Sequence, residues 1–242
     1  MSWLDFYEAR YTSKTAQTIL RSETVKSAEH ARIEERIKSY VELPVTAAVL
    51  DVGGGPATYL SSLNTVTTDL SLNALRMSKR VDRVQCDAMR LPFGSECFDL
   101  IVCSQVLEHV PDWQRALREI VRVAKVGAAI YIAVPNRYAL MKRRYHPLQR
   151  KIDASGHIHE FREFQLVFEL QELGVGNLKT SGACYDLFWI SSALERSKLA
   201  RFAVPLLDKI DARVLRRLFI AETRMRAKKL DGFSLEIIGT KG

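Results

Sequence analysis

The chain has 242 residues, of which 47% are apolar and 26% charged, and its formal net charge is +8. Twelve glycines and seven prolines exclude a collagen-like or low-complexity chain, and the apolar fraction is high enough for one globular domain with modest additions. Charged residues near the amino terminus interrupt the apolar run that a secretory signal needs, so we predict a cytoplasmic protein.

The first predicted element is a charged, helix-favouring stretch over residues 15–42, closed by Pro44. Short apolar runs then alternate with helical or turn-rich pieces, which predicts strands at 45–51, 65–69, 83–87, 98–103 and 128–134. Amphipathic spacing predicts helices from Pro111 to a stop at Gly127 and from Phe161 to a stop at Gly174. Two further strands are expected at 178–184 and 233–240.

Strands that alternate with helices indicate an α/β fold, with a mostly parallel sheet covered by helices on both faces. We divide the chain into a helical amino-terminal cap (1–44), a core (45–185), a basic helical insertion (186–231) and the last strand of the core (232–242). The insertion is inferred because the connection before the last strand is too long for a simple turn.

The positive charge is concentrated in two late segments. Residues 196–229 hold eleven Lys or Arg and three acids, and residues 137–151 hold six basic residues and no acid. These two segments therefore carry the entire positive excess of the chain. A solvated helical face, an anionic membrane surface and RNA phosphates are the three explanations that this pattern leaves open.

The four cysteines form no Cys-x-x-Cys pair and have no histidine partners at metal-ligand spacing. We therefore interpret Cys86, Cys97, Cys103 and Cys184 as reduced packing residues.

Three strand ends carry the residue types that a nucleotide-like ligand needs. Gly53, Gly54 and Gly55 follow the first strand and allow the backbone to approach a ligand closely, although Thr58 stands where a dinucleotide fingerprint would have its last glycine. Asp69 ends the second strand, where its carboxylate suits ribose hydroxyls or caps the helix that follows, and Asp87 ends the third. Ligands of such sheets bind at the carboxyl ends of the strands, so we expect these groups to lie together.

Taken in order, these segments resemble the class I S-adenosylmethionine-dependent methyltransferases, and among them the ubiquinone and menaquinone biosynthesis type. The resemblance is carried by Leu50 to Pro56, Asp69, Asp87 to Phe93, Phe98 to Cys103 and Val106 to Val110. It implies a Rossmann-like sheet of seven mostly parallel strands with an antiparallel last strand. It also implies S-adenosylmethionine as the cofactor.

The resemblance assigns a role to each strand end. Gly53, Gly54 and Gly55 would hold the aminocarboxypropyl end of the cofactor, and Asp51 would orient this loop or reach the amino group through water. Asp69 would bind the ribose.

The same resemblance places the adenine and the methionine moiety. Leu70 would lie beside the adenine, which Asp87, Ala88 and Met89 would recognise. Ser104 and Gln105, after the fourth strand, would lie against the methionine moiety.

The catalytic candidates are three histidines. The sulfonium is already an activated methyl donor, so catalysis needs alignment of a nucleophile and, for an oxygen acceptor, a general base. His109 follows the fourth strand, and His157 and His159 lie before the helix predicted at Phe161; His109 also suits a structural hydrogen-bonding role. His157, His159 and Glu160 lack a separated third ligand, so we predict no metal site.

We therefore predict a methyltransferase that acts on a small-molecule or lipid-linked acceptor, through oxygen. The basic residues 196–229 suit peripheral contact with an anionic membrane surface. The alternatives are a tRNA or RNA methyltransferase that uses the basic segments, and a non-catalytic partner subunit that binds S-adenosylmethionine.

Overall fold

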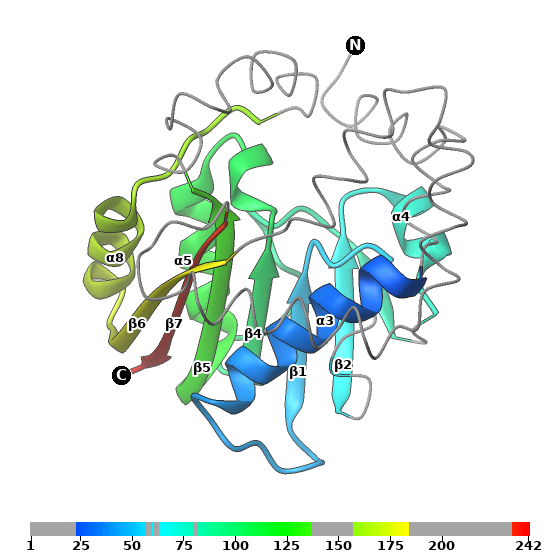
Figure 1. Cartoon of the computed structure of the whole chain (residues 1–242), viewed down its shortest axis with the longest axis horizontal. Coiled ribbons are helices and arrows are strands. Elements are labelled where there is room, and N and C mark those ends of the chain that lie inside the picture. Colours follow the sequence, from blue (N-terminus) through cyan, green and yellow to red (C-terminus); the bar gives the residue numbers. More distant parts are fainter. Residues whose placement is uncertain (1–22, 57–59, 61–62, 80–81, 137–156, 184–233) are drawn as a thin grey trace.

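The computed structural model describes residues 23–56, 60, 63–79, 82–136, 157–183 and 234–242. In these residues seven strands form one sheet in the order β3-β2-β1-β4-β5-β7-β6 (Figure 1). The strands are β1 (Ala48–Val52), β2 (Asn64–Asp69), β3 (Arg83–Gln85), β4 (Phe98–Ser104), β5 (Ala124–Pro135), β6 (Val175–Ala183) and β7 (Ser234–Lys241). The predicted insertion and both basic segments lie outside the described residues.

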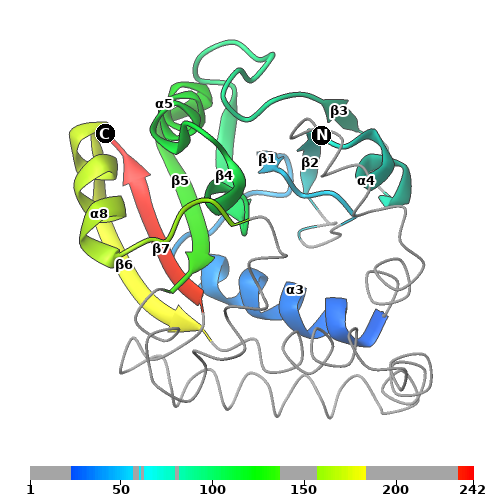
Figure 2. The ribbon, with the colours of Figure 1, turned by 90° about the horizontal axis from the view of Figure 1, so that it is seen from above.

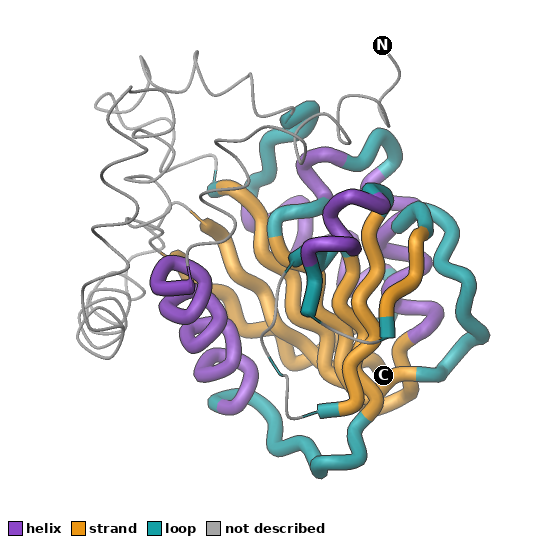
Figure 3. The backbone as a smooth tube through the Cα atoms, turned by 90° about the vertical axis from the view of Figure 1, so that its right-hand side faces the viewer, coloured by secondary structure: helices purple, strands orange, loops and turns teal. Residues whose placement is uncertain are grey.

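Only β7 runs against its neighbours. The pairs β1/β2, β2/β3, β1/β4 and β4/β5 are parallel, whereas β7 is antiparallel to both β5 and β6. Figure 3 shows the strands side by side in one twisted sheet. The predicted fold class, with seven strands and an antiparallel last strand, is therefore confirmed.

Helices cover both faces of this sheet, as Figure 2 shows from above. Helix α3 (Glu23–Lys38) lies on one face, and α5 (Trp113–Val123) and α8 (Glu163–Glu172) lie on the other. The short helix α4 (Leu72–Met77) contacts β2 and β3, and a 3-10 turn, η1 (Leu107–His109), follows β4. A separate apolar core fills each interface between the sheet and its helices.

The amphipathic helix α5 forms as predicted but ends earlier than expected. Asp112 caps it by accepting a hydrogen bond from the Arg115 N–H at 2.9 Å. The predicted stop at Gly127 is wrong, because Ala124 already pairs with Phe98 of β4 and begins β5. Gly127 instead lies inside that strand with φ of +82°.

Strand order reverses between β1 and β4. From β1 the chain runs to β2 and β3 on one side, and it then crosses to β4 on the other side of β1. Val52, the last residue of β1, pairs with Thr68 of β2 and with Cys103 of β4. The carboxyl ends of these three strands therefore meet at the point where sheets of this kind bind their ligands.

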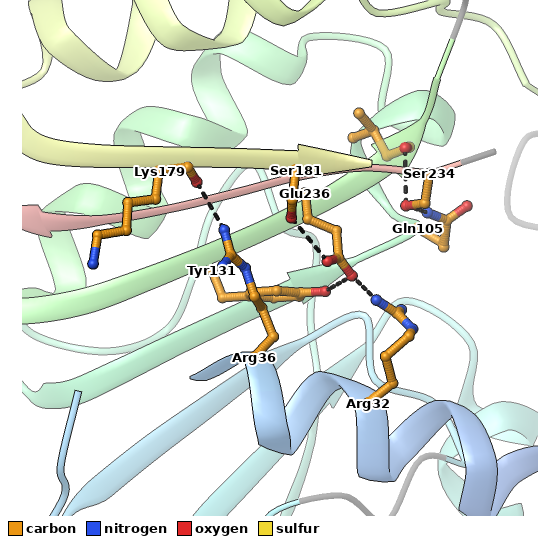
Figure 4. Close-up of polar contacts among 9 residues, drawn as sticks. Arg32, Arg36, Gln105, Tyr131, Lys179, Ser181, Ser234 and Glu236 are labelled. Carbon is orange, nitrogen blue, oxygen red and sulfur yellow. Dashed lines mark hydrogen bonds and ion pairs between the residues drawn. The ribbon is translucent and has the colours of Figure 1, made fainter. Parts of the chain in front are cut away.

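A buried carboxylate joins α3 to three strands (Figure 4). Glu236 of β7 forms an ion pair with Arg32 of α3, and both side chains are at most 4% exposed. The Tyr131 hydroxyl of β5 donates to the Glu236 carboxylate at 2.5 Å, and the Ser181 hydroxyl of β6 donates to it at 3.3 Å. Because a buried charge is costly without a partner, this network fixes α3 against the sheet.

Replacing Glu236 with Gln should lower the free energy of unfolding by about 3 kcal/mol, because it leaves the Arg32 guanidinium buried without its counter-charge. Urea denaturation measures this change. Arg32→Met should lower the free energy of unfolding by a similar amount. The double variant should lose less than the sum of the two single losses, because both changes remove the same ion pair.

Lys38→Ala is the matched control. Lys38 forms a solvent-exposed pair with Glu34 one turn along the same helix, and its loss should cost at most about 0.5 kcal/mol. Equal effects of Glu236→Gln and Lys38→Ala would contradict the assigned role of the buried pair.

Candidate active site at the strand ends

The glycine loop after β1 is closely packed from two sides. Gly53 and Gly55 have φ of +67° and +49°, a conformation that side chains other than glycine rarely adopt. A Cβ on Gly53 would come within 2.5 Å of the Val106 side chain, and a Cβ on Gly54 would overlap the carboxylate of Asp51. The structure thus places Asp51, which is fully buried, directly against the loop that it was predicted to orient.

The two other strand-end acids use the same local geometry. Asp69 is 5% exposed and accepts a hydrogen bond from the Ser71 N–H at 2.8 Å. Asp87 is half-buried and accepts one from the Met89 N–H, also at 2.8 Å. A carboxylate has about four acceptor positions, so each can accept further hydrogen bonds from a ligand.

The alternative role of Asp69 as a helix cap is wrong. Ser71 caps α4 by accepting a hydrogen bond from the Ala74 N–H at 3.1 Å. Asp69 lies two residues earlier, at the end of β2, where its side chain accepts the hydrogen bond from the Ser71 N–H.

The remaining cofactor candidates lie at or just after the same strand ends. Leu70, Ala88, Met89 and Ser104 are half-buried. Gln105 has φ of +59°, and its side-chain amide donates to the Ser234 hydroxyl at 3.2 Å. Gln105 thereby connects the end of β4 to the first residue of β7, as Figure 4 shows.

The thiols at these strands are shielded rather than reactive. Burial raises the pKa of Cys86 to about 11, opposed by a hydrogen bond with Thr68 and reinforced by Asp87 and Asp69. Burial, then the Glu108 and Asp51 carboxylates, raises the pKa of Cys103 well above its ordinary value. Cys97 is exposed, so the prediction that it is a packing residue is wrong; Cys184 lies outside the described residues.

The chemistry of these groups fits S-adenosylmethionine. Because the loop consists of glycines, its backbone is open to contact by the aminocarboxypropyl group. Two carboxylates at neighbouring strand ends suit hydroxyl and amine donors. The crowding of Gly53 and Gly54 by Val106 and Asp51 leaves space for nothing larger than hydrogen at these positions. When bound, the cofactor supplies an activated methyl group.

The structure also gathers a cluster that the sequence indicated only in part. Oε1 of Glu108 lies 3.8 Å from Nε2 of His109 and 3.9 Å from Nε2 of His157. The imidazole rings of His109 and His157 meet edge to face, with centroids 4.7 Å apart. We call Glu108, His109 and His157 the histidine cluster.

His159 and Glu160 lie outside this cluster. The Nε2 atom of His159 is 3.2 Å from the carbonyl oxygen of Pro111, and Glu160 is exposed. Sequence reasoning missed Glu108 as a functional candidate, although it had singled out the segment that contains it. The contact that brings His157 to Glu108 is tertiary and leaves no local pattern in the sequence. The backbone N–H groups of Ile158 and His159 both donate to the Glu108 carbonyl oxygen.

Comparison with known proteins agrees with this geometry. Residues 50–132 match the family described as a methyltransferase domain. An uncharacterized protein of Methanocaldococcus jannaschii is 29% identical over 171 residues, which cover 67% of this chain and 70% of that protein. The demethylmenaquinone methyltransferase of Mycolicibacterium paratuberculosis is 37% identical over 91 residues, covering 35% of this chain and 40% of that enzyme.

A solved structure supports the fold. A S-adenosylmethionine-dependent methyltransferase of Thermotoga maritima, described as a possible histamine N-methyltransferase, superposes with a TM-score of 0.66. The two sequences are 15% identical, and the alignment covers 100% of each chain.

The match to the methyltransferase domain begins in β1 and ends within β5, so it spans all the strands whose ends form the glycine loop and the acids. The chain therefore contains a methyltransferase domain over residues 50–132, in the fold of the class I S-adenosylmethionine-dependent methyltransferases, and S-adenosylmethionine is its cofactor. Within this class it resembles the ubiquinone and menaquinone biosynthesis enzymes.

Gly54→Ala should weaken binding of S-adenosylmethionine about tenfold or more, because the added methyl group displaces either Asp51 or the loop. Isothermal titration calorimetry measures the affinity, and circular dichroism checks that the variant is folded. Gly176→Ala is the matched control, since a Cβ there meets nothing within 4 Å. An unchanged affinity in Gly54→Ala would overturn the assignment of this loop.

Proposed function

We propose that this methyltransferase transfers the methyl group to a lipid-linked hydroxylated aromatic ring of the quinol class. The observation that carries the proposal is the position of the histidine cluster. Glu108 and His109 belong to η1, and Val106, which precedes this turn, packs against Gly53 of the glycine loop. The turn that carries Glu108 and His109 thus begins beside the loop assigned to the methionine end of the cofactor.

The chemistry of a quinol suits such imidazoles. A hydroxyl on an aromatic ring becomes a strong nucleophile once it is ionised, and its charge reaches both the oxygen and the adjacent ring carbons. Imidazoles accept protons near neutral pH and are the usual groups for this task. We propose that the cluster promotes ionisation of the acceptor hydroxyl.

The ring carbon is the proposed methylation site, which replaces the oxygen expected from the sequence. The support is similarity to proteins named ubiquinone/menaquinone biosynthesis C-methyltransferase and demethylmenaquinone methyltransferase. These matches cover 19% and 40% of the length of those enzymes.

We also propose peripheral contact with an anionic membrane, because a lipid-linked acceptor resides there. The support is the basic composition of residues 137–151 and 196–229, which lie outside the described residues. None of the helices in the described ranges is long and apolar enough to span a bilayer.

The acceptor is tested with three substrates offered with S-adenosylmethionine: a short-chain prenylated naphthoquinol, the same ring with both hydroxyls blocked as ethers, and a tRNA pool. Mass spectrometry should detect a methylated product only from the free quinol, and nuclear magnetic resonance should place the new methyl group on a ring carbon. Methylation of the oxygen would correct the proposed position. Methylation of the blocked ring or of the tRNA would overturn the proposed function.

The membrane contact is tested by replacing Arg213, Arg216 and Arg217 with Gln. Each basic residue near an anionic surface contributes about 1 kcal/mol, so sedimentation with phosphatidylserine vesicles should weaken on the order of 100-fold while cofactor affinity is retained. The control replaces the exposed Arg76, Arg115 and Arg118 with Gln and should bind vesicles as the parent does. Absence of vesicle binding by the parent protein would refute the membrane contact.

A further inference from the structure

The carboxylate and the two imidazoles of the histidine cluster converge on one another. The Glu108–His109 and Glu108–His157 distances of 3.8 and 3.9 Å exceed the range of a hydrogen bond. All three donor atoms nevertheless lie within 4.8 Å of one another. Ligands at about 2.1 Å from one tetrahedral zinc ion lie roughly 3.4 Å apart, so a small contraction would close this set around a cation.

The backbone already holds the three residues in place. Glu108 and His109 are consecutive in η1, where both are buried. His157 comes from a later part of the chain, and the backbone N–H groups of Ile158 and His159 donate to the Glu108 carbonyl oxygen at 2.9 and 3.2 Å.

A second set of contacts fixes the segment that carries His157. Asn136, just past β5, forms a parallel bridge with Phe161. The Phe161 ring is 2% exposed and packs edge-on against Trp113 of α5. The segment that follows His157 is therefore anchored at Ile158, His159 and Phe161, and binding a ligand at the cluster needs little reorganisation.

The local field also favours a cation. The Glu108 side chain is fully buried, and that of His109 is 6% exposed. The Cys103 thiol, buried at the end of β4, experiences the carboxylates of both Glu108 and Asp51, which help to raise its pKa. Two carboxylates thus act on one dry region between the glycine loop and the cluster, where charge interactions are strong.

We infer that Glu108, His109 and His157 form a binding site for one divalent transition-metal ion, of which zinc is the best fit. Two imidazoles and one carboxylate favour zinc over magnesium, which prefers oxygen ligands only. Three protein ligands are typical of catalytic zinc sites, which keep a further position open for water or substrate. The sequence-based expectation of no metal considered His157, His159 and Glu160, whereas the structure assembles a different set.

The open coordination position of the ion gives the site a role in the reaction. This role rests on the proposed function. His157 is 27% exposed, so the cluster is reached from its side. An acceptor hydroxyl bound to the ion would lose its proton more readily, because the cation stabilises the resulting oxyanion. The proton leaves to solvent, which reaches the cluster from the half-exposed side of His157.

The test uses the full chain, without an affinity tag that binds metals, after dialysis against a chelator. Equilibrium dialysis with Zn²⁺ and elemental analysis should give one ion per chain. His157→Ala should lower zinc affinity by more than about 100-fold, the upper end of the loss seen when only outer-shell partners are removed. Co²⁺ in place of Zn²⁺ should give visible absorption bands of a site with nitrogen and oxygen ligands, which His157→Ala abolishes.

His159→Ala is the matched control, because it removes a histidine of the same segment that lies outside the cluster. It should retain zinc binding. Glu108→Gln changes a fully buried residue, so circular dichroism must check that this variant folds. The test does not depend on that variant, because His157 is only half-buried and His157→Ala is measured separately.

Zinc binding that is equal in the parent and in His157→Ala, or absent from both, would overturn the metal site. Quinol methylation that persists in the metal-free parent would leave the proposed function intact, with imidazoles as the bases. Zinc binding without quinol methylation would support the site and refute the proposed acceptor.

Discussion

The crowding of the loop after β1 is the constraint on which the functional end of the molecule depends. Asp51 lies beneath Gly54, and Val106 lies against Gly53, so this backbone has no room for a side chain on either residue. Asp51 belongs to β1 and Val106 to the chain just past β4, which are neighbouring strands. The pairing of β1 with β4 therefore sets the shape of the loop, and any shift between these strands would change the cofactor site.

The same pairing connects the cofactor site to the histidine cluster. Val106 immediately precedes η1, so the residue that shapes the glycine loop also determines where Glu108 and His109 begin. Gln105, in a backbone conformation unusual for a residue with a side chain, makes the turn that directs the chain out of β4. Its hydrogen bond to Ser234 adds β7 to this arrangement, so the last strand in the chain also supports the site.

Much of the fold and of the cofactor site could be predicted from the sequence, because both depend on local patterns. Short apolar runs marked the strands, and Gly53, Asp69 and Asp87 stand at their ends, where a parallel sheet must bring them together. The limits of α5 were mispredicted because Gly127 suggested a stop, whereas pairing of Ala124 with β4 ended the helix earlier. That pairing is a tertiary interaction with no local signal.

The histidine cluster and the Glu236 network were not predictable for the same reason. Glu108 faces His157 only because two backbone hydrogen bonds bring a distant segment to η1. Glu236 lies in the mostly buried strand β7, and its partner Arg32 lies in a helix near the other end of the chain. Composition alone indicates neither pairing, because Glu and Arg are residue types that usually lie on the solvent-exposed surface.

The boundary of the family match separates two parts of the active site. Residues 50–132 contain the glycine loop, Asp69, Asp87, Glu108 and His109, whereas His157 lies beyond them. The strand ends assigned to the cofactor thus belong to the methyltransferase domain, while the cluster is completed by a segment outside the match. We propose that this later segment distinguishes one acceptor from another, because it completes the cluster to which the acceptor is assigned. Its anchoring through Phe161 and Trp113 gives it a fixed geometry, which discrimination between acceptors requires.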